Sequence, residues 1–282
     1  MSFPVRLEPR AGSGIDPFYR AGIAKTWGTA VLPGVTMDAP SSAGPGVKIK
    51  VASYNIHKAV GLDRRRDHER ILRILLEVDA DVVALQEVDR RFGRRMAALP
   101  LDAIHDATDY HPVPLSMKPD SLGWHGNAIL VRKGIDLVEA APVPLPVLEP
   151  RGAIRADLMI EGRRLRVVGM HLDLSGLRRR HQVRSVLSHI SECDHHCPTV
   201  MMGDLNEWAQ RGGCLREFDE QWRILAPGRS FPARRPIASL DRIIVSAHWE
   251  VHGTHVHHSP ASAVGSDHLP VFASLHLPGK PQ

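Results

Sequence analysis

The stretch Pro198-Thr-Val-Met-Met-Gly-Asp-Leu-Asn206 joins a short apolar run to two polar side chains. A proline and a glycine bound the run, so Val200 to Met202 is predicted to be a buried strand. We expect Gly203 to let the backbone turn sharply, and alternation to place Asp204 and Asn206 on one side of the chain. A carboxylate and an amide there suit the orientation of a water molecule and the binding of a charged oxygen. The alternative is an Asx turn, in which both side chains only cap the following backbone.

The size and composition of the chain are those of a globular α/β protein. Its 282 residues suffice for one large domain or two small ones, and its hydrophobic content of 43% is ordinary. No apolar stretch approaches the ~20 residues of a membrane span, and residues 1–20 lack the apolar centre of a signal peptide. We therefore expect a cytoplasmic protein, and we predict a monomer. Three cysteines are too few for a disulfide framework. The net charge of +5 and the pI near 9.4 favour a polyanionic partner without requiring one.

The pattern divides the chain into an extension and a folded body. Residues 1–46 are rich in glycine and proline and lack periodicity, which predicts a partly irregular N-terminal extension. Residues 47–278 form the predicted domain. It opens with strand, helix and strand at 48–56, 67–78 and 82–87, which suggests a βαβ unit, with a mixed sheet as the alternative. Further predicted elements are strands at 126–131, 153–160, 165–171, 240–245, 249–257 and 269–277, helices at 102–108 and 177–190, and a proline-rich sheet edge or loop at 135–150.

Polar side chains of catalytic types stand at the ends of the predicted strands or in the adjoining loops. Taken singly, each could be a surface or turn residue. Their concentration at strand ends is typical of a rigid scaffold that holds a reactive group of residues. The set comprises Asn55, Glu87, His171, Asp204 with Asn206, Asp241, and Asp267 with His268.

These residues lie in short motifs that resemble, in order, those of the endonuclease/exonuclease/phosphatase superfamily. The resemblance covers about residues 47–277 and identifies 47–278 as a catalytic domain of this deoxyribonuclease I-like type. It implies a four-layer α/β sandwich, with two mixed β-sheets packed face to face and helices outside. The motifs are Ser53-Tyr-Asn55-Ile-His57, Leu85-Gln-Glu87-Val88, His171-Leu-Asp173, Gly203-Asp-Leu-Asn206, Leu240-Asp-Arg242 and Gly265-Ser-Asp-His268.

The resemblance implies a phosphoesterase that depends on Mg²⁺ or Mn²⁺. Attack on an anionic phosphate requires neutralised charge and a positioned water, and oxygen ligands suit these hard ions. Three residues would form the metal site: Glu87 as the main ligand, Asn55 beside it and Asp267 in support. In the catalytic roles, Asp204 would orient or deprotonate the water and Asn206 would hold a phosphate oxygen.

Three further residues complete the implied catalytic set. Asp241 would orient His268, which acts on the phosphate or the water as a base or as a cation. His171 would lie across the scissile bond, where it polarises a phosphoryl oxygen or protonates the leaving group. Tyrosine takes this position in the abasic-site endonucleases, so a histidine here points away from that branch.

Two more residues are candidates for substrate binding. Asn127 would contact phosphate, or else its amide only closes a turn. Lys58 follows Asn55 closely enough to meet an anion, or else it is a solvated lysine.

The predicted function is hydrolysis of a phosphate ester, most simply by a nuclease-like phosphodiesterase. The basic charge favours nucleic acid as the substrate, whereas an aromatic content of 5% offers few side chains for stacking on bases. The alternative substrate is a phospholipid or phosphoinositide head group. A non-catalytic phosphate-binding module is disfavoured, because a binder needs neither His171 nor the pair of Asp241 and His268.

Overall fold

The computed structural model describes residues 46–90, 96–115, 120–146 and 151–279. The predicted extension at 1–46 therefore lies outside the described residues, apart from Gly46. The elements of the described part are β1 (Val47–Asn55), η1 (His57–Ala59), α2 (His68–Val78), β2 (Val82–Gln86), α3 (Leu101–Ala107), β3 (Tyr110–Pro112), β4 (Asn127–Arg132), β5 (Asp136–Val143), β6 (Gly152–Ile160), β7 (Arg163–His171), α4 (Gly176–Ser191), β8 (Thr199–Asp204), η2 (Gly213–Glu217), β9 (Trp222–Leu225), β10 (Asp241–Ser246), β11 (Glu250–Val256), α5 (Ser262–Gly265) and β12 (Val271–Leu277).

The strands form two six-stranded sheets. The first sheet has the order β11-β12-β1-β2-β4-β3, and the second has the order β5-β6-β7-β8-β10-β9. Each sheet contains one parallel pair, β1 with β2 in the first and β7 with β8 in the second. The other neighbours are antiparallel. Both sheets are therefore mixed, and the βαβ opening is present as β1, α2 and β2.

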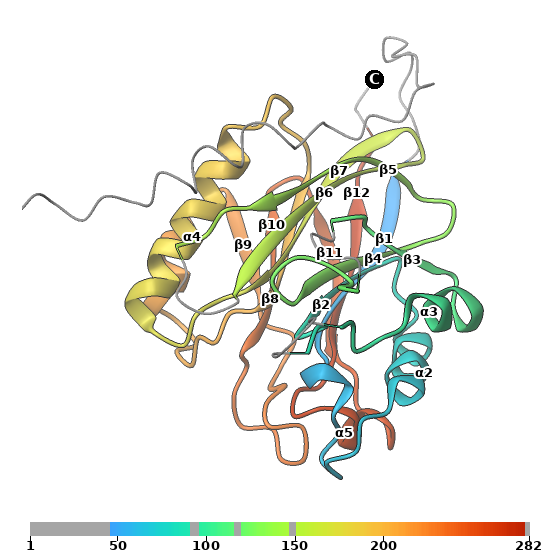
Figure 1. Ribbon diagram of the computed structural model, residues 1–282. Coiled ribbons are helices and arrows are strands. Elements are labelled where there is room, and N and C mark those ends of the chain that lie inside the picture. The colour runs from blue at the N-terminus through green and yellow to red at the C-terminus, as the bar shows by residue number, and fades with distance from the viewer. Residues whose placement is uncertain (1–45, 91–95, 116–119, 147–150, 280–282) are drawn as a thin grey trace, which may run out of the picture. The chain divides into compact units, whose positions relative to one another are not determined.

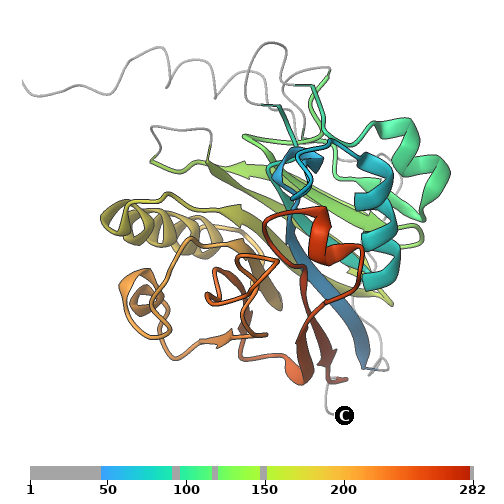
Figure 2. The same ribbon diagram turned by 90° about the horizontal axis from the view of Figure 1, so that it is seen from below.

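Three apolar layers join the two packed sheets and the helices, whose arrangement is drawn in Figures 1 and 2. The central layer lies between the sheets and joins side chains such as Val51 and Val82 of the first sheet to Val167 and Met202 of the second. A second layer lies between the first sheet and helices α2 and α3. The third lies between the second sheet and α4. The described residues thus form the predicted α/β sandwich, with helices on the outer sides of the two packed sheets.

The helix α2 shows how the sequence sets these layers. Its apolar residues Ile71, Leu72, Leu75 and Val78 recur at helical spacing and are buried. Asp67 precedes the helix in extended conformation, and its Oδ1 accepts a hydrogen bond of 2.9 Å from the backbone N–H of Arg70. This N-cap satisfies one of the free donors of the first turn.

Two local predictions for the strand β8 are wrong. Gly203 does not turn the chain, because it lies inside β8 and pairs with Arg242. A Cβ at this position would lie 1.8 Å from the carbonyl oxygen of Met170, so the glycine permits a close approach of two strands. Asp204 and Asn206 do not share a side through alternation, since Asn206 has a φ of 50°. The backbone N–H of Asn206 donates to Asp204 Oδ1 at 2.9 Å, which is the Asx turn.

The helices of the described part are short. None of them combines the length and the apolar character that crossing a membrane requires.

Candidate active site

The ends of three neighbouring strands bring polar side chains together in the second sheet. His171 ends β7 and Asp204 ends β8, and the two are register partners in a parallel pair. Asp241 begins β10, which runs antiparallel to β8, so it is the register partner of Asp204 on the other side. This topology places three catalytic candidates side by side at the ends of strands β7, β8 and β10.

The first sheet contributes Asn55, whose side chain contacts a residue of the second sheet. Asn55 ends β1, and its Nδ2 donates a hydrogen bond of 3.1 Å to Asp204 Oδ2. The two residues are 149 positions apart in the chain, and both are buried. This bond joins the ends of the two sheets and brings Asn55 and Asp204 together.

Asp204 is the centre of the polar cluster. In addition to Asn55, its Oδ2 lies 3.4 Å from His171 Nε2 and 3.7 Å from His268 Nε2. Only 1% of Asp204 is exposed. Burial raises the pKa of the Asp204 carboxyl, His268 counteracts this rise, and the charge of Asp241 adds to it. A carboxylate with a raised pKa takes up a proton more readily, which suits a group that receives one from water.

Asp241 and His268 form a close buried pair. His268 Nδ1 lies 2.9 Å from Asp241 Oδ2, and the hydroxyl of Ser230 donates to the same oxygen at 2.5 Å. Burial alone lowers the pKa of His268, but the charges of Asp241 and Asp204 outweigh this effect and raise the pKa to about 10. His268 is therefore a cation at neutral pH, so the geometry favours the cationic role over the basic one.

Asp204, Asp241 and His268 are here called the buried triad. Their ligand atoms all lie within 4.8 Å of one another, a spacing that could hold a metal ion. The pairing of Asp241 with His268 uses the ring Nδ1 and one carboxylate oxygen, whereas Asp241 Oδ1 is buried without a hydrogen-bond partner among the described residues.

The predicted metal ligand Glu87 lies beside Asn55 in the first sheet. It follows β2, one residue beyond Gln86, the register partner of Asn55. Glu87 has a φ of 55°, and its Oε2 contacts Nζ of Lys58. An ammonium group thus lies against the carboxylate, which shows that this position accepts positive charge. The sequence predicted Lys58 to be a substrate contact, and the structure places it on Glu87.

Asp267 and Asn55 are the other two residues predicted to offer oxygen ligands. Asp267 precedes His268, and its Oδ1 lies 3.2 Å from Ser266 Oγ and 3.9 Å from His57 Nδ1. Asn55 Oδ1 accepts the backbone N–H of His57 at 3.1 Å. The donor set of two carboxylates and one amide oxygen fits a hard divalent cation such as Mg²⁺.

Asn206 and Asn127 both donate to backbone carbonyls. Asn206 Nδ2 donates to the carbonyl of Leu172 at 3.0 Å, which ties the ends of β7 and β8 together. Asn127 Nδ2 lies 3.4 Å from the carbonyl oxygens of Trp124 and His125. This contact supports the turn-closing role of Asn127. Its direct contact with phosphate stays a prediction.

Several residues of the site escaped the sequence analysis. Arg151, which is 7% exposed, contacts His171 Nε2 through its guanidinium group. No periodic pattern marks this arginine, and only the pairing of the adjacent Gly152 with His171 brings it to the site. Ser266 Oγ donates to the carbonyl of Asn55 at 2.7 Å. This serine lies inside the motif quoted for His268, so its position was a signal that the analysis left unused.

Two aromatic side chains adjoin the buried triad. The ring of Phe231 lies 4.8 Å from the ring of His268, centroid to centroid. Trp208 meets Phe231 edge to face at 6.1 Å, and 60% of Trp208 is exposed. An exposed aromatic surface therefore leads from solvent toward His268.

The paired mixed sheets and the polar cluster at their strand ends define the deoxyribonuclease I-like class of α/β sandwich proteins. A family model described as "Endonuclease/Exonuclease/phosphatase family" matches residues 52–268. The chain belongs to the endonuclease/exonuclease/phosphatase family. This family consists mostly of hydrolytic phosphoesterases, includes nucleases, phosphatases and phosphodiesterases, and generally depends on divalent metal ions.

One relative is similar in sequence, and solved structures share the fold at low sequence identity. The uncharacterized protein YbhP of Escherichia coli K12 is 28% identical over 261 residues, which cover 81% of this chain and 96% of YbhP. The structure of D. rerio TDP2 with a single-strand DNA product has a TM-score of 0.63 at 17% identity and covers 81% and 98% of the two chains. The Bacteroides thetaiotaomicron mannosyl-6-phosphatase has a TM-score of 0.63 at 19% identity, with coverage of 80% and 99%.

Proposed function

We propose that the protein hydrolyses phosphate diesters in nucleic acid with the help of a bound Mg²⁺ or Mn²⁺ ion. The observation that carries this proposal is the chain of contacts from Asn55 through Asp204 to His268 and Asp241. These contacts join both sheets, and all four side chains are buried. Burying carboxylates around a charged imidazole costs free energy, because buried charges lose their hydration. Such clusters are found preferentially at functional sites.

Glu87, Asn55 and Asp267 would hold the ion. When bound, it would neutralise phosphate charge and lower the pKa of a water molecule. The position is suited to a cation, since the Lys58 ammonium already contacts the Glu87 carboxylate. A bound ion would compete with the Lys58 ammonium for the Glu87 carboxylate.

Asp204 would receive the proton of the attacking water. Its carboxylate has a pKa raised by burial, and the N–H of Asn206 and the amide of Asn55 fix its two oxygens in place. The water oxygen forms a bond to phosphorus, the bond from phosphorus to the leaving oxygen breaks, and the water proton passes to Asp204. Fixing the carboxylate in advance lowers the entropic cost of this step.

The phosphate oxygens would meet the imidazole and amide groups of the site. His268, charged and oriented by Asp241, would stabilise the negative charge that builds on a phosphoryl oxygen. Asn206 would add a second donor. His171 would polarise a phosphoryl oxygen or protonate the leaving group, and the neighbouring Arg151 adds positive charge beside it.

The surroundings of the site favour nucleic acid as the substrate. The aromatic surface of Trp208 and Phe231 adjoins His268 and offers a face on which a base can stack. The net charge of +5 adds attraction for a polyanion. The relative TDP2 was solved with a single-strand DNA product. The low aromatic content of the chain is thus offset by the placement of these two side chains.

A lipid head group remains the second candidate, for one specific reason. Three large apolar side chains are exposed on the loops that follow β7 and β8 or at the start of α4: Leu174 at 65%, Leu177 at 67% and Trp208 at 60%. Arg179 links these loops, since it donates to the carbonyl of Leu174 at 2.7 Å and to Glu207 at 3.2 Å. Exposed apolar groups beside a phosphoesterase site also suit contact with a lipid surface.

A substrate panel tests the proposal. The protein is incubated with supercoiled plasmid, abasic duplex DNA, sphingomyelin and phosphoinositide vesicles, and bis-p-nitrophenyl phosphate, with Mg²⁺, with Mn²⁺ and with chelator. We expect metal-dependent nicking of the plasmid that His268→Ala abolishes and His258→Ala, a change at an exposed histidine, leaves intact. Turnover of lipid alone would support the second candidate. Absence of turnover with every substrate would contradict the enzymatic proposal.

A further inference from the structure

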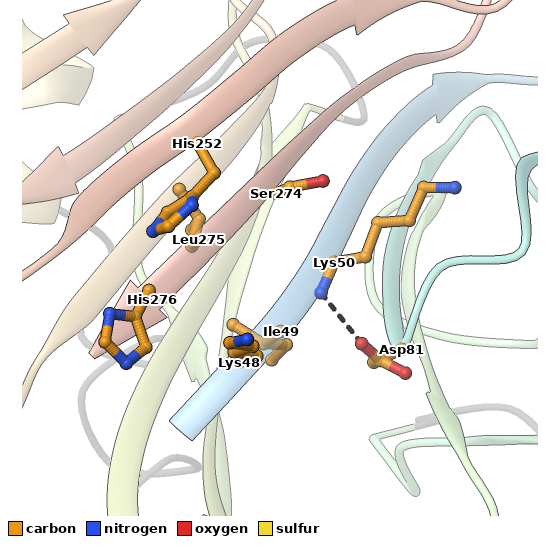
Figure 3. A pocket seen from close by; sticks show the side chains of 8 residues that line it. All are labelled: Lys48, Ile49, Lys50, Asp81, His252, Ser274, Leu275 and His276. Atoms are coloured by element: carbon orange, nitrogen blue, oxygen red, sulfur yellow. Dashed lines mark hydrogen bonds between the residues drawn. The ribbon is translucent and has the colours of Figure 1, made fainter. Parts of the chain in front are cut away.

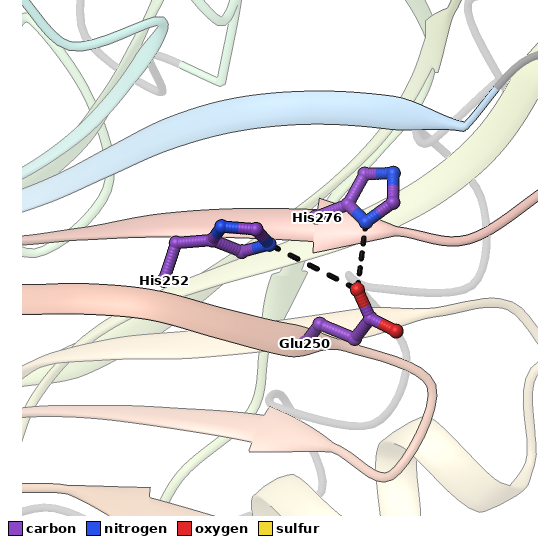
Figure 4. A group of neighbouring side chains, drawn as sticks. All are labelled: Glu250, His252 and His276. Atoms are coloured by element: carbon purple, nitrogen blue, oxygen red, sulfur yellow. Dashed lines mark hydrogen bonds and ion pairs between the residues drawn. The ribbon is translucent and has the colours of Figure 1, made fainter.

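A second group of imidazole and carboxylate side chains lies on the outer face of the first sheet, at its β11 edge. Helices α2 and α3 cover this face over residues such as Tyr54 and Leu85, but β11 and the adjoining ends of β12 and β1 carry polar side chains there. Glu250 and His252 come from β11, and His276 comes from β12 (Figure 4). These three residues are here called the edge triad.

The sheet register explains why the three side chains meet. Glu250 and His276 are register partners in the antiparallel pair of β11 and β12. The register shifts between Val251 and Gly253, so His252 is an extra residue in a β-bulge. Bulges re-aim side chains, and Figure 4 shows the rings of His252 and His276 both directed at the Glu250 carboxylate.

The distances within the edge triad fit a tetrahedral ion. Glu250 Oε2 lies 2.8 Å from His276 Nδ1 and 3.8 Å from His252 Nε2, and all three ligand atoms are within 4.8 Å of one another. Two donors at about 2.0–2.1 Å from a tetrahedral Zn²⁺ ion are roughly 3.3 Å apart. The two shorter separations lie on either side of this value, so small side-chain rotations suffice for binding.

The donor types select the kind of ion. Two imidazole nitrogens and one carboxylate oxygen favour Zn²⁺, Co²⁺ or Ni²⁺ over Mg²⁺, which prefers oxygen ligands. Glu250 and His252 are exposed, with side-chain exposures of 58% and 57%, so an ion reaches them from solvent without unfolding.

Two lysines adjoin the edge triad, and one of them, Lys48, is the register partner of His276. His252 and His276 line a cavity of about 360 Å³ together with Lys48 and Lys50 (Figure 3). The Lys50 ammonium lies over the ring of Phe272, 4.5 Å from its centroid, and Figure 3 shows this side chain extending away from the two histidines. Asp81 adds a carboxylate on the same wall and accepts the backbone N–H of Lys50 at 2.7 Å.

We propose that the edge triad binds one transition-metal ion of the Zn²⁺ class, at a site separate from the phosphoesterase centre. The ion links the edge strand β11 to β12 through protein ligands from both strands. Its remaining coordination position holds water. Because the folded protein brings the three ligands together and the unfolded chain does not, the ion stabilises the folded protein.

Co²⁺ and Zn²⁺ binding to untagged protein test this proposal. Co²⁺ is titrated and followed by its visible d–d absorption, and Zn²⁺ is measured by competition with a chromophoric chelator. We expect one bound equivalent that survives in Glu87→Gln. In His252→Ala, and in His276→Ala, the dissociation constant should rise by at least about 10-fold. His258→Ala serves as the matched control and should bind like the wild type.

A thermal measurement guards against loss of fold in the variants. Zn²⁺ should raise the Tm of the wild type and of His258→Ala but leave that of His252→Ala unchanged, and His252 is exposed enough to replace without loss of core packing. The proposal is overturned if the wild type binds neither ion. Equal binding by all variants, or loss of binding only in Glu87→Gln, would overturn it too.

Discussion

The buried triad and the edge triad use the same chemical groups in two different surroundings. In each, three ligand atoms of imidazole and carboxylate groups lie within 4.8 Å of one another. All three members of the buried triad are buried, whereas two members of the edge triad are exposed. In the buried triad, burial lowers the pKa of His268, but the close charges of Asp241 and Asp204 outweigh this effect and raise the pKa to about 10. The same groups thus serve as a fixed charged pair inside the protein and as accessible metal ligands at its surface.

The largest effect is expected at the centre of the buried triad. Asp204→Asn keeps the shape of the side chain but removes the group that would receive the water proton. Turnover of bis-p-nitrophenyl phosphate should fall on the order of 10³-fold. The matched change Glu250→Gln in the edge triad leaves the proton acceptor in place. If Asp204→Asn retained turnover within a few-fold of the wild type, Asp204 would not be the group that receives the water proton.

The next largest effect is a difference in the free energy of unfolding between substitutions at two glycines, Gly203 and Gly253. A Cβ at Gly203 would lie 1.8 Å from the backbone oxygen of Met170, whereas a Cβ at Gly253 would meet only the ring of His255, at 3.1 Å. Gly203→Ala should lower the free energy of unfolding by about 3 kcal/mol, because backbone must move. Gly253→Ala should change it by less than about 1 kcal/mol. Urea unfolding of both variants measures the difference, and equal values would show that β7 and β8 approach less closely than described.

A smaller effect is expected when the partner of His268 is changed. Asp241→Asn removes the charge that orients the imidazole and raises its pKa. The value of kcat should fall about 10²-fold, and the pKa of His268 should drop. Steady-state kinetics with an NMR titration separates this positioning role from a loss of fold. A lower kcat with an unchanged His268 pKa would argue against it.

The smallest effect is expected at the exposed aromatic surface. Trp208→Ala should raise KM for nucleic acid by about 10-fold, since one stacking contact is lost, and leave kcat nearly unchanged. The KM for bis-p-nitrophenyl phosphate, a substrate without a stacked base, should remain the same. An equal rise for both substrates would indicate a structural role for Trp208.

The sequence predicts much of the fold because the strands that build it are long and strongly apolar. Strands β1, β6 and β7 were predicted from alternation or apolar runs, and the cap of α2 from Asp67. The strands β3 and β9 were not predicted. They have three and four residues, and β9 is largely half-buried or exposed, so neither shows a clear period. Gly203 was misread because a glycine that permits close strand packing and a glycine that turns the chain look alike in sequence.

The candidate site also combines residues that could be predicted from the sequence with residues that could not. Asn55, Asp204, Asp241 and His268 could be predicted because each stands in a short motif at a strand end or in an adjoining loop. Arg151 could not, since only the register of β6 against β7 brings it to His171. The direction of the Asn206 side chain could not be predicted either, because its left-handed φ breaks the alternation on which the prediction depended.

An NMR titration of His268 tests most directly the claim that Asp241 and Asp204 hold its imidazole as a cation. In chelator-treated protein, the ring of His268 should stay protonated through neutral pH and lose its proton near pH 10. This shift also predicts a stabilising contribution that is complete below the unfolded pKa of about 6.5 and is lost as the pH rises through about 10. A ring that loses its proton near pH 6.5 would contradict the account, because Asp241 and Asp204 would then not hold it as a cation.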